Sequence, residues 1–127
     1  MNNKTRHNFD IQVETLYLKS ESEPDNSRYV FAYTITIENR GDRPAQLLTR
    51  HWTITDANGR IQEVNGEGVV GKQPLIKPGE GFQYTSGALL ETPVGIMEGS
   101  YQFVTDDGES ISTPIRPFTL SIPRTLH

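Results

Sequence analysis

The sequence predicts an all-β protein, a sandwich of about seven or more short strands. Hydrophobic and polar residues alternate over several short stretches, which is the period of strands that bury one face. Turn residues separate these stretches, because 11 glycines and 8 prolines are spread along the 127 residues. Only 34% of the residues are hydrophobic, which suits sheets with one buried and one wet face. We expect no helix.

Residues 9–19 and 29–38 are the first two predicted strands, separated by a polar turn at 20–27. The first alternates from Phe9 onward. The second is the clearest strand in the chain, and its alternate positions predict a buried face that consists of Tyr29, Phe31, Tyr33, Ile35 and Ile37.

The third predicted strand, 46–56, follows a turn at 39–44. Its even positions Leu48, Trp52 and Ile54 are expected to face the core, with Arg50 interrupting them.

A hairpin turn follows at 56–59, because Asn58-Gly59 readily adopts positive φ at both central positions, and 60–65 forms the returning strand. After an irregular excursion at 66–81, strands are expected at 82–86, 98–103 and 114–122, the last two separated by a turn at 106–108.

Two details favour an immunoglobulin-like sandwich. Trp52 lies within the third strand, where such folds often bury a tryptophan. Gly99-x-Tyr101-x-Phe103 has the spacing of a tyrosine corner. Both are packing signals and carry no functional content.

Charge and composition exclude several classes of function. Lys and Arg number 12 against 16 Asp and Glu, a net charge of -4, which disfavours non-specific binding to nucleic acid or anionic membrane. The absence of cysteine excludes disulfides, cysteine-bound zinc and thiol catalysis. Residues 1–8 lack the apolar core of a signal peptide and are expected to be flexible, with a single domain at 9–127. We expect a cytoplasmic protein without nucleic-acid or membrane partners.

Three glycines, Gly66, Gly68 and Gly71, match the G-x-G-x-x-G pattern of dinucleotide-binding proteins. That pattern requires a helix that begins at the third glycine. Pro74 and Pro78 prevent one here.

Two interpretations of the glycine segment remain. Its backbone N–H groups could form an anion-binding concavity at Gly66, Gly68 and Gly71, with Lys72 adding a positive charge. Alternatively, the glycines permit a sharply bent loop that needs positive φ. Glu67, inside the motif, would repel an anion and favours the second interpretation.

Metal binding is not expected. His7, His51 and His127 lack metal-ligand spacing and would need carboxylates such as Glu63 or Glu80. Asp56-x-Asn58-Gly59 matches the start of a calcium loop, but Ile61 occupies the place of the required glycine, so a hairpin turn explains the segment better.

No catalytic residues or cofactor are predicted, and we expect no enzyme. Ser86 lacks a nucleophile elbow and a nearby histidine. Arg40, Arg43 and Arg50 with Trp52 could make an RNA-binding face, but charged strand edges that deter aggregation explain the arginines better.

An ordered series of segments resembles the bacterial ApaG family, and the likeness runs from Phe9 to His127. The segments are Arg50-His51-Trp52, Thr55-Asp56-Ala57-Asn58-Gly59, Gly66-Glu67-Gly68-Val69-Val70-Gly71, Gln73-Pro74, Pro78-Gly79-Glu80, Tyr84-Thr85-Ser86-Gly87 and Thr92-Pro93-x-Gly95-x-Met97-x-Gly99-x-Tyr101.

The resemblance implies a fibronectin type III-like sandwich without an established catalytic activity. It also implies a genetic link to cobalt tolerance and magnesium efflux. Related eukaryotic domains suggest a protein-binding role. The resemblance supplies no metal ligands.

Two functional hypotheses follow. The first is a non-catalytic interaction module that presents a strand edge, or the irregular surface at 66–81, to an unidentified protein partner. The second is a binder of a phosphorylated small molecule, such as pyrophosphate or a nucleotide, through Gly66, Gly68, Gly71 and Lys72. A homodimer is possible in either case, because sandwich edges can pair.

Overall fold

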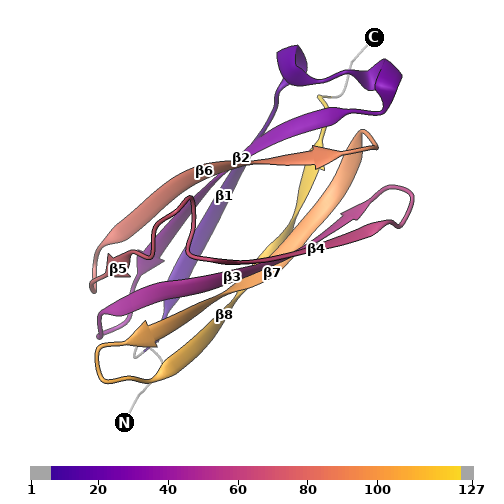
Figure 1. Ribbon diagram of the computed structural model, residues 1–127. Helices are drawn as coiled ribbons and strands as arrows, with labels where there is room; N and C mark the ends of the chain where they lie inside the picture. The colour runs from indigo at the N-terminus through magenta and orange to yellow at the C-terminus, as the bar shows by residue number, and fades with distance from the viewer. Residues whose placement is uncertain (1–6, 124–127) are drawn as a thin grey trace.

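The computed structural model describes residues 7–123 as two antiparallel β-sheets packed face to face (Figure 1). One sheet has the strand order β1-β2-β6 and the other β4-β3-β7-β8, with β5 also pairing with β3. The strands are β1 (Phe9–Tyr17), β2 (Tyr29–Asn39), β3 (Ala45–Asp56), β4 (Ile61–Glu67), β5 (Leu75–Ile76), β6 (Gly81–Leu90), β7 (Val94–Thr105) and β8 (Ser110–Ser121). The predicted all-β sandwich is confirmed.

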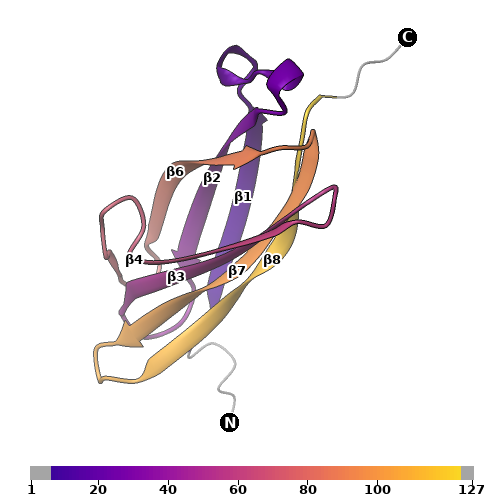
Figure 2. The same ribbon diagram turned by 45° about the vertical axis from the view of Figure 1, so that its right-hand side comes forward.

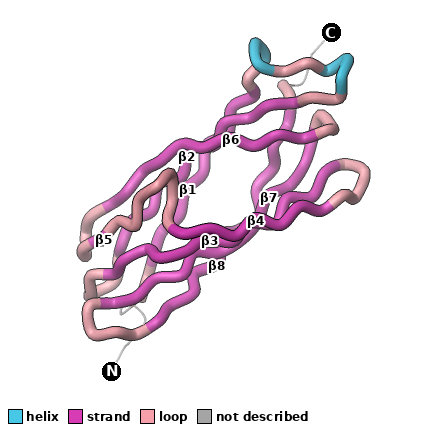
Figure 3. The backbone as a smooth tube through the Cα atoms, in the orientation of Figure 1, coloured by secondary structure: helices cyan, strands magenta, loops and turns pink. Residues whose placement is uncertain are grey.

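In the described part of the chain, residues 7–123, helical structure is limited to two single 3-10 turns between β1 and β2. These are η1 (Lys19–Glu21), which begins one residue before the predicted polar turn at 20–27, and η2 (Pro24–Asn26), which lies inside it. Figure 3 shows both in cyan at one end of the sandwich. Within residues 7–123, no helix is long and apolar enough to cross a membrane. The predicted flexibility of residues 1–8 falls largely on residues 1–6, outside the described part of the chain.

The core lies between the two sheets and follows the alternation of β2. Phe31, Ile35 and Ile37 are fully buried, as the pattern predicts. Trp52 lies at the centre and makes edge-to-face contacts with Tyr33, Tyr101 and Phe118. Such contacts add about 0.5–1.5 kcal/mol per pair beyond the burial of apolar area.

One inward-facing residue of β3 was predicted wrongly. Leu48 is only half-buried, whereas Leu47 is fully buried. The register between β3 and β7 shifts between Leu47 and Thr49, so a β-bulge changes which parity faces the core. Trp52 and Ile54, beyond the bulge, face inward as predicted.

The hairpin turn between β3 and β4 differs in its loop geometry from the prediction. The strands on either side pair as a hairpin, as predicted. Within the turn, only Gly59 has positive φ, so the positive φ predicted at Asn58 is wrong, and the Asp56 N–H donates to the Arg60 carbonyl across a three-residue loop. The Asp56 carboxylate accepts the N–H groups of Asn58 and Arg60, which stabilises this longer loop.

The later strands are longer than predicted, because glycines that indicate turns lie inside them. β6 extends through Gly87 to Leu90, and β7 begins at Val94, four residues before the predicted start at Glu98. A Cβ atom at Gly99 would lie 1.9 Å from the His51 carbonyl oxygen, so this glycine permits a close approach of two strands.

The two lateral sides of the sandwich differ. On what we call the closed side, β1 and β8 lie against each other, and Phe9 stacks on Phe103 with ring centroids 4.2 Å apart. On the opposite side, which we call the open side, β4 and β6 are edge strands of different sheets and approach each other far less closely. Figures 1 and 2 show this separation from two directions.

Candidate functional site

The glycine segment forms a tight hairpin at the end of β4. Val69 and Lys72 exchange two backbone hydrogen bonds, and the two residues between them, Val70 and Gly71, have φ of 44° and 79°. Positive φ at both central positions is the signature of a type I′ turn. The glycines therefore do provide the bent loop that the second interpretation expected.

Most of the loop's N–H groups are engaged inside the protein. Gly68 N–H donates to the Leu48 carbonyl, and Val69 and Lys72 donate to each other's carbonyls. Gly66 lies within β4, opposite Arg50. Ligand binding by Gly66, Gly68, Gly71 and Lys72 stays a prediction, for which the backbone leaves few donors.

Arg50 of β3 contacts the backbone of the glycine segment at several positions. It follows the same parity as Trp52 and Ile54, so its side chain leaves β3 on the inner face. A Cβ atom at Gly66 would lie 2.6 Å from Nη1 of Arg50, so the guanidinium lies across the bare backbone of β4. Arg50 Nη1 donates to the carbonyls of Glu67, at 3.1 Å, and Gly68, at 2.9 Å.

A cluster of tyrosines lies close to the Arg50 guanidinium. The Tyr84 and Tyr101 hydroxyls hydrogen-bond to each other at 2.5 Å. Burial raises the pKa of Tyr33, Tyr84 and Tyr101, and the positive charge of Arg50 partly offsets this. The hydroxyl of Tyr101 thus bonds to another side chain, whereas a tyrosine corner would bond to upstream backbone.

A groove of about 420 Å³ lies on the open side. Both edge strands contribute to it, and its lining is Ile54, Arg60, Gln62, Val64, Gly87, Ala88, Leu89 and Glu91. Arg60 donates to the Glu91 carboxylate at 2.6 Å. Leu89 is 46% exposed and Val64 37%, so the groove offers apolar surface to a ligand.

The β6 edge lacks the features that usually protect edge strands from pairing. Natural edges carry charges, prolines or bulges. Between Gly81 and Leu90, β6 contains no charged residue, no proline and no shift in its register with β2. The other long edges differ, because β1 contains Asp10 and Glu14, β4 contains Glu63 and Glu67, and β8 contains Pro114, Arg116 and Pro117.

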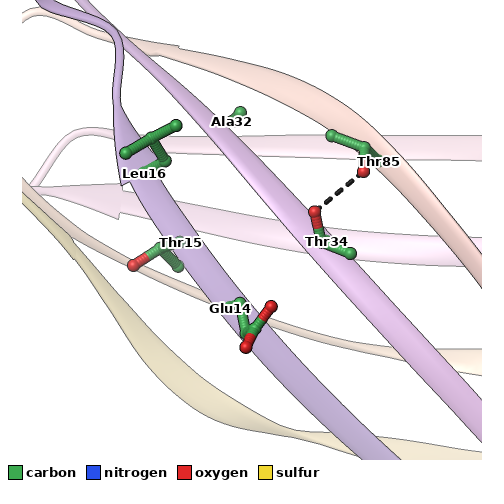
Figure 4. Close-up of a pocket in the computed structure, with 6 residues that line it drawn as sticks. All are labelled: Glu14, Thr15, Leu16, Ala32, Thr34 and Thr85. Carbon is green, nitrogen blue, oxygen red and sulfur yellow. Dashed lines mark hydrogen bonds between the residues drawn. The ribbon is translucent and has the colours of Figure 1, made fainter.

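The outer face of the three-stranded sheet carries a shallow hollow of about 540 Å³, shown in Figure 4. It is lined by Glu14, Thr15, Leu16, Ala32, Thr34 and Thr85. The Thr34 and Thr85 hydroxyls hydrogen-bond to each other at 2.8 Å, and Leu16 is 63% exposed. Glu14 is the one ionisable residue in this lining, so the hollow offers no acid–base pair.

The remaining candidate residues lie apart. Arg40 pairs with Glu38 and Arg43 with Asp106, whereas Trp52 is buried, so these residues do not form a common RNA-binding face.

The described histidines contact single carboxylates. His51 approaches Glu63 at 3.2 Å, and His7 approaches Glu109 at 3.1 Å. Across residues 7–123, no group of three or more acidic or histidine side chains could hold a metal ion. His127 lies outside the described residues.

The sequence did not predict the role of Arg50 at the glycine segment, nor that β6 would be the exposed strand edge. A signal for Arg50 existed, namely a charged residue on the alternating buried face of β3. Its role depends on Gly66, however, and only the register of β3 with β4 brings the two together.

The comparisons with known proteins agree with this architecture. Residues 19–105 match the model of the ApaG domain family. The chain is 55% identical to the protein ApaG of Azotobacter vinelandii over 96% of this chain and 97% of that one. It is 53% identical to ApaG of Xanthomonas campestris pv. campestris over the full length of both. A crystal structure of a Bordetella pertussis protein named ApaA superposes with a TM-score of 0.92 at 48% identity, covering 95% of this chain and 98% of that one. The chain belongs to the ApaG family.

Proposed function

We propose that this protein is a non-catalytic interaction module that binds a protein partner on the open side of the sandwich. The observation that carries the proposal is the β6 edge, with ten residues free of charge, proline and bulge. An exposed edge of this kind is a template for another strand. The apolar groove beside it adds surface that a partner would bury.

Site-specific photo-crosslinking in cells tests this proposal. A photoreactive amino acid replaces Leu89 on β6, and in the matched control it replaces Thr119, an exposed residue of the β8 edge. We expect an adduct of discrete mass at Leu89, which mass spectrometry identifies and the purified partner reproduces. The same adducts at both positions, or none at Leu89, would contradict the proposal.

The family resemblance links the protein to cobalt tolerance and magnesium efflux, and we propose that this link acts in the cytoplasm through the same partner. A strain that lacks the gene is complemented with Leu89→Lys, which puts a charge on the β6 edge, or with Thr119→Lys as control. We expect the first variant to lose cobalt tolerance and the second to keep it. Full complementation by Leu89→Lys would separate the metal link from the β6 edge.

A further inference from the structure

We propose that the occupant of the open side is an extended, acidic segment of the partner, which adds to β6 as a fourth strand and places a carboxylate against Arg50. This inference rests on the proposed function and specifies the chemistry of the partner. It combines three observations: an open strand edge, an apolar groove and an arginine without an acidic partner.

The edge supplies the backbone contacts. β6 pairs only with β2, so in the described structure the N–H and C=O groups on its other edge have no strand to bond to. A strand added there would extend the three-stranded sheet and lie over the groove, where Val64 and Ala88 offer apolar contacts. Strand addition of this kind takes its affinity from main-chain hydrogen bonds and its specificity from alternate side chains.

Arg50 supplies the charge. Its Nη1 is held by two carbonyl oxygens, which orient the guanidinium and leave its positive charge unneutralised. Among residues 7–123, no carboxylate lies within 4 Å of its guanidinium, whereas Arg40 and Arg43 each have two and Arg60 has one. A carboxylate from a partner could form charge-assisted hydrogen bonds with the remaining guanidinium donors.

The register of β4 predicts the spacing of the partner's side chains. Val64 lines the groove, and Gly66, two residues further along the same strand, lies beneath the Arg50 guanidinium. Side chains two residues apart in a strand point to the same face and lie about 7 Å apart. The docked segment should therefore present an apolar and an acidic residue separated by one residue, in the order that its direction along β6 dictates.

A second copy of this chain fits the open side less well. The β6 segment contains no acidic residue, so pairing of two β6 strands would provide no carboxylate from those strands for Arg50.

The test selects binders for the immobilised full chain from a phage library of random peptides of about 12 residues, enough to cover β6. Synthetic copies of the selected peptides are titrated by fluorescence anisotropy. We expect them to share the apolar-x-acidic spacing, or its reverse, and to slow amide exchange across residues 81–90. Arg50→Gln should weaken binding at least about tenfold, and Arg40→Gln should leave it unchanged.

If Arg50→Gln unfolds the protein, the same contact is tested from the side of the peptide. The acidic residue of the peptide is replaced by its amide, and binding to the unaltered protein should fall by the same factor. Peptides that protect β6 without an acidic residue would overturn this inference and leave the proposed function intact. Protection of β6 in a peptide-free dimer would assign the edge to a second copy. Peptides that protect other strands would contradict both proposals.

Discussion

The closed and open sides of the sandwich join the same two sheets in different ways. On the closed side, Phe9 and Phe103 stack across the layers, and Pro114 and Arg116 interrupt the β8 edge. On the open side, β6 is uninterrupted, and a groove separates it from β4. The closed side has the features of a boundary that stabilises the fold, whereas the open side leaves apolar surface and backbone groups unpaired with another strand.

This difference indicates where function can be sought in a fold that carries no obvious catalytic group. Stability and protection from aggregation explain the stacked rings of the closed side and the prolines and charge of its β8 edge. They do not explain an uncharged edge of ten residues or an arginine held by carbonyl oxygens beside it. Features that weaken a fold are expected where it binds something else.

Truncation of one side chain on each side gives the largest expected contrast. Phe103→Ala removes a buried ring that stacks on Phe9 and should lower the free energy of unfolding by about 3–5 kcal/mol. Leu89→Ala, on the open side, should change it by less than about 0.5 kcal/mol, because Leu89 is half exposed. Urea unfolding measures both. Equal losses would show that the open side also holds the sheets together.

Removal of a tyrosine hydroxyl tests the polar contact between the layers. Tyr84→Phe leaves the buried hydroxyl of Tyr101 without its partner and should destabilise the fold by about 1–3 kcal/mol. If Tyr84→Phe lowered the free energy of unfolding as much as Phe103→Ala does, the tyrosine contact would hold the two sheets together as strongly as the closed side does.

The same cluster predicts a dependence on alkaline pH. The pKa values of Tyr33, Tyr84 and Tyr101 are raised by burial, so each favours the folded state fully below the pKa of the unfolded tyrosine, about 10, and loses that contribution as pH rises above it. Urea unfolding between about pH 9 and 11 should show a decline that is shallower in Tyr84→Phe. Identical slopes in the two proteins would indicate that Tyr84 does not titrate differently on unfolding.

Much of the fold could be predicted because its strongest patterns are local. The alternation of β2 determines its buried face without help from other strands, and Phe31, Ile35 and Ile37 are buried as expected. The change of parity in β3 could not be predicted, since Leu47 and Leu48 are equally apolar and only the pairing with β7 decides which one is buried.

The site was less predictable, because it depends on contacts between distant residues. The G-x-G-x-x-G pattern suggested a ligand loop, whereas Gly66 makes room for the Arg50 guanidinium and Gly71 permits a tight turn. Arg50 interrupts a buried face in the sequence, and only the structure shows that loop carbonyls hold it. The groove arises from strands that never pair, which no local pattern reports.

A smaller effect is expected at the tip of the type I′ turn, which follows β4 on the open side. Val70 has φ of 44° and is 53% exposed, a strained combination for a β-branched residue. Val70→Asn places the favoured residue before Gly71 and should raise the melting temperature by about 2–5 °C. The control Val94→Asn, on a strand, should produce no rise. A lower melting temperature for Val70→Asn would show that contacts of the valine outweigh its strain.

The smallest expected effect is the response of the glycine loop to pyrophosphate. Among the described hydrogen bonds, none engages the N–H groups of Val70 and Gly71, so an anion would have to bind there with help from Lys72. Binding at a concentration equal to Kd would stabilise the fold by about 0.4 kcal/mol. We expect neither a thermal shift nor amide shifts with millimolar pyrophosphate.

The informative variant for this titration is Lys72→Gln. Gly68→Val is unsuitable, because a Cβ atom at Gly68 would lie 2.2 Å from the Lys72 carbonyl oxygen and disrupt the turn itself. Shifts at Val70 and Gly71 that disappear in Lys72→Gln would establish an anion site at the end of β4. The open side would then hold two kinds of ligand, a peptide along β6 and an anion on the loop. Amide shifts at Glu67 and Gly68, whose carbonyls accept hydrogen bonds from Arg50, would report whether binding of the two ligands is coupled.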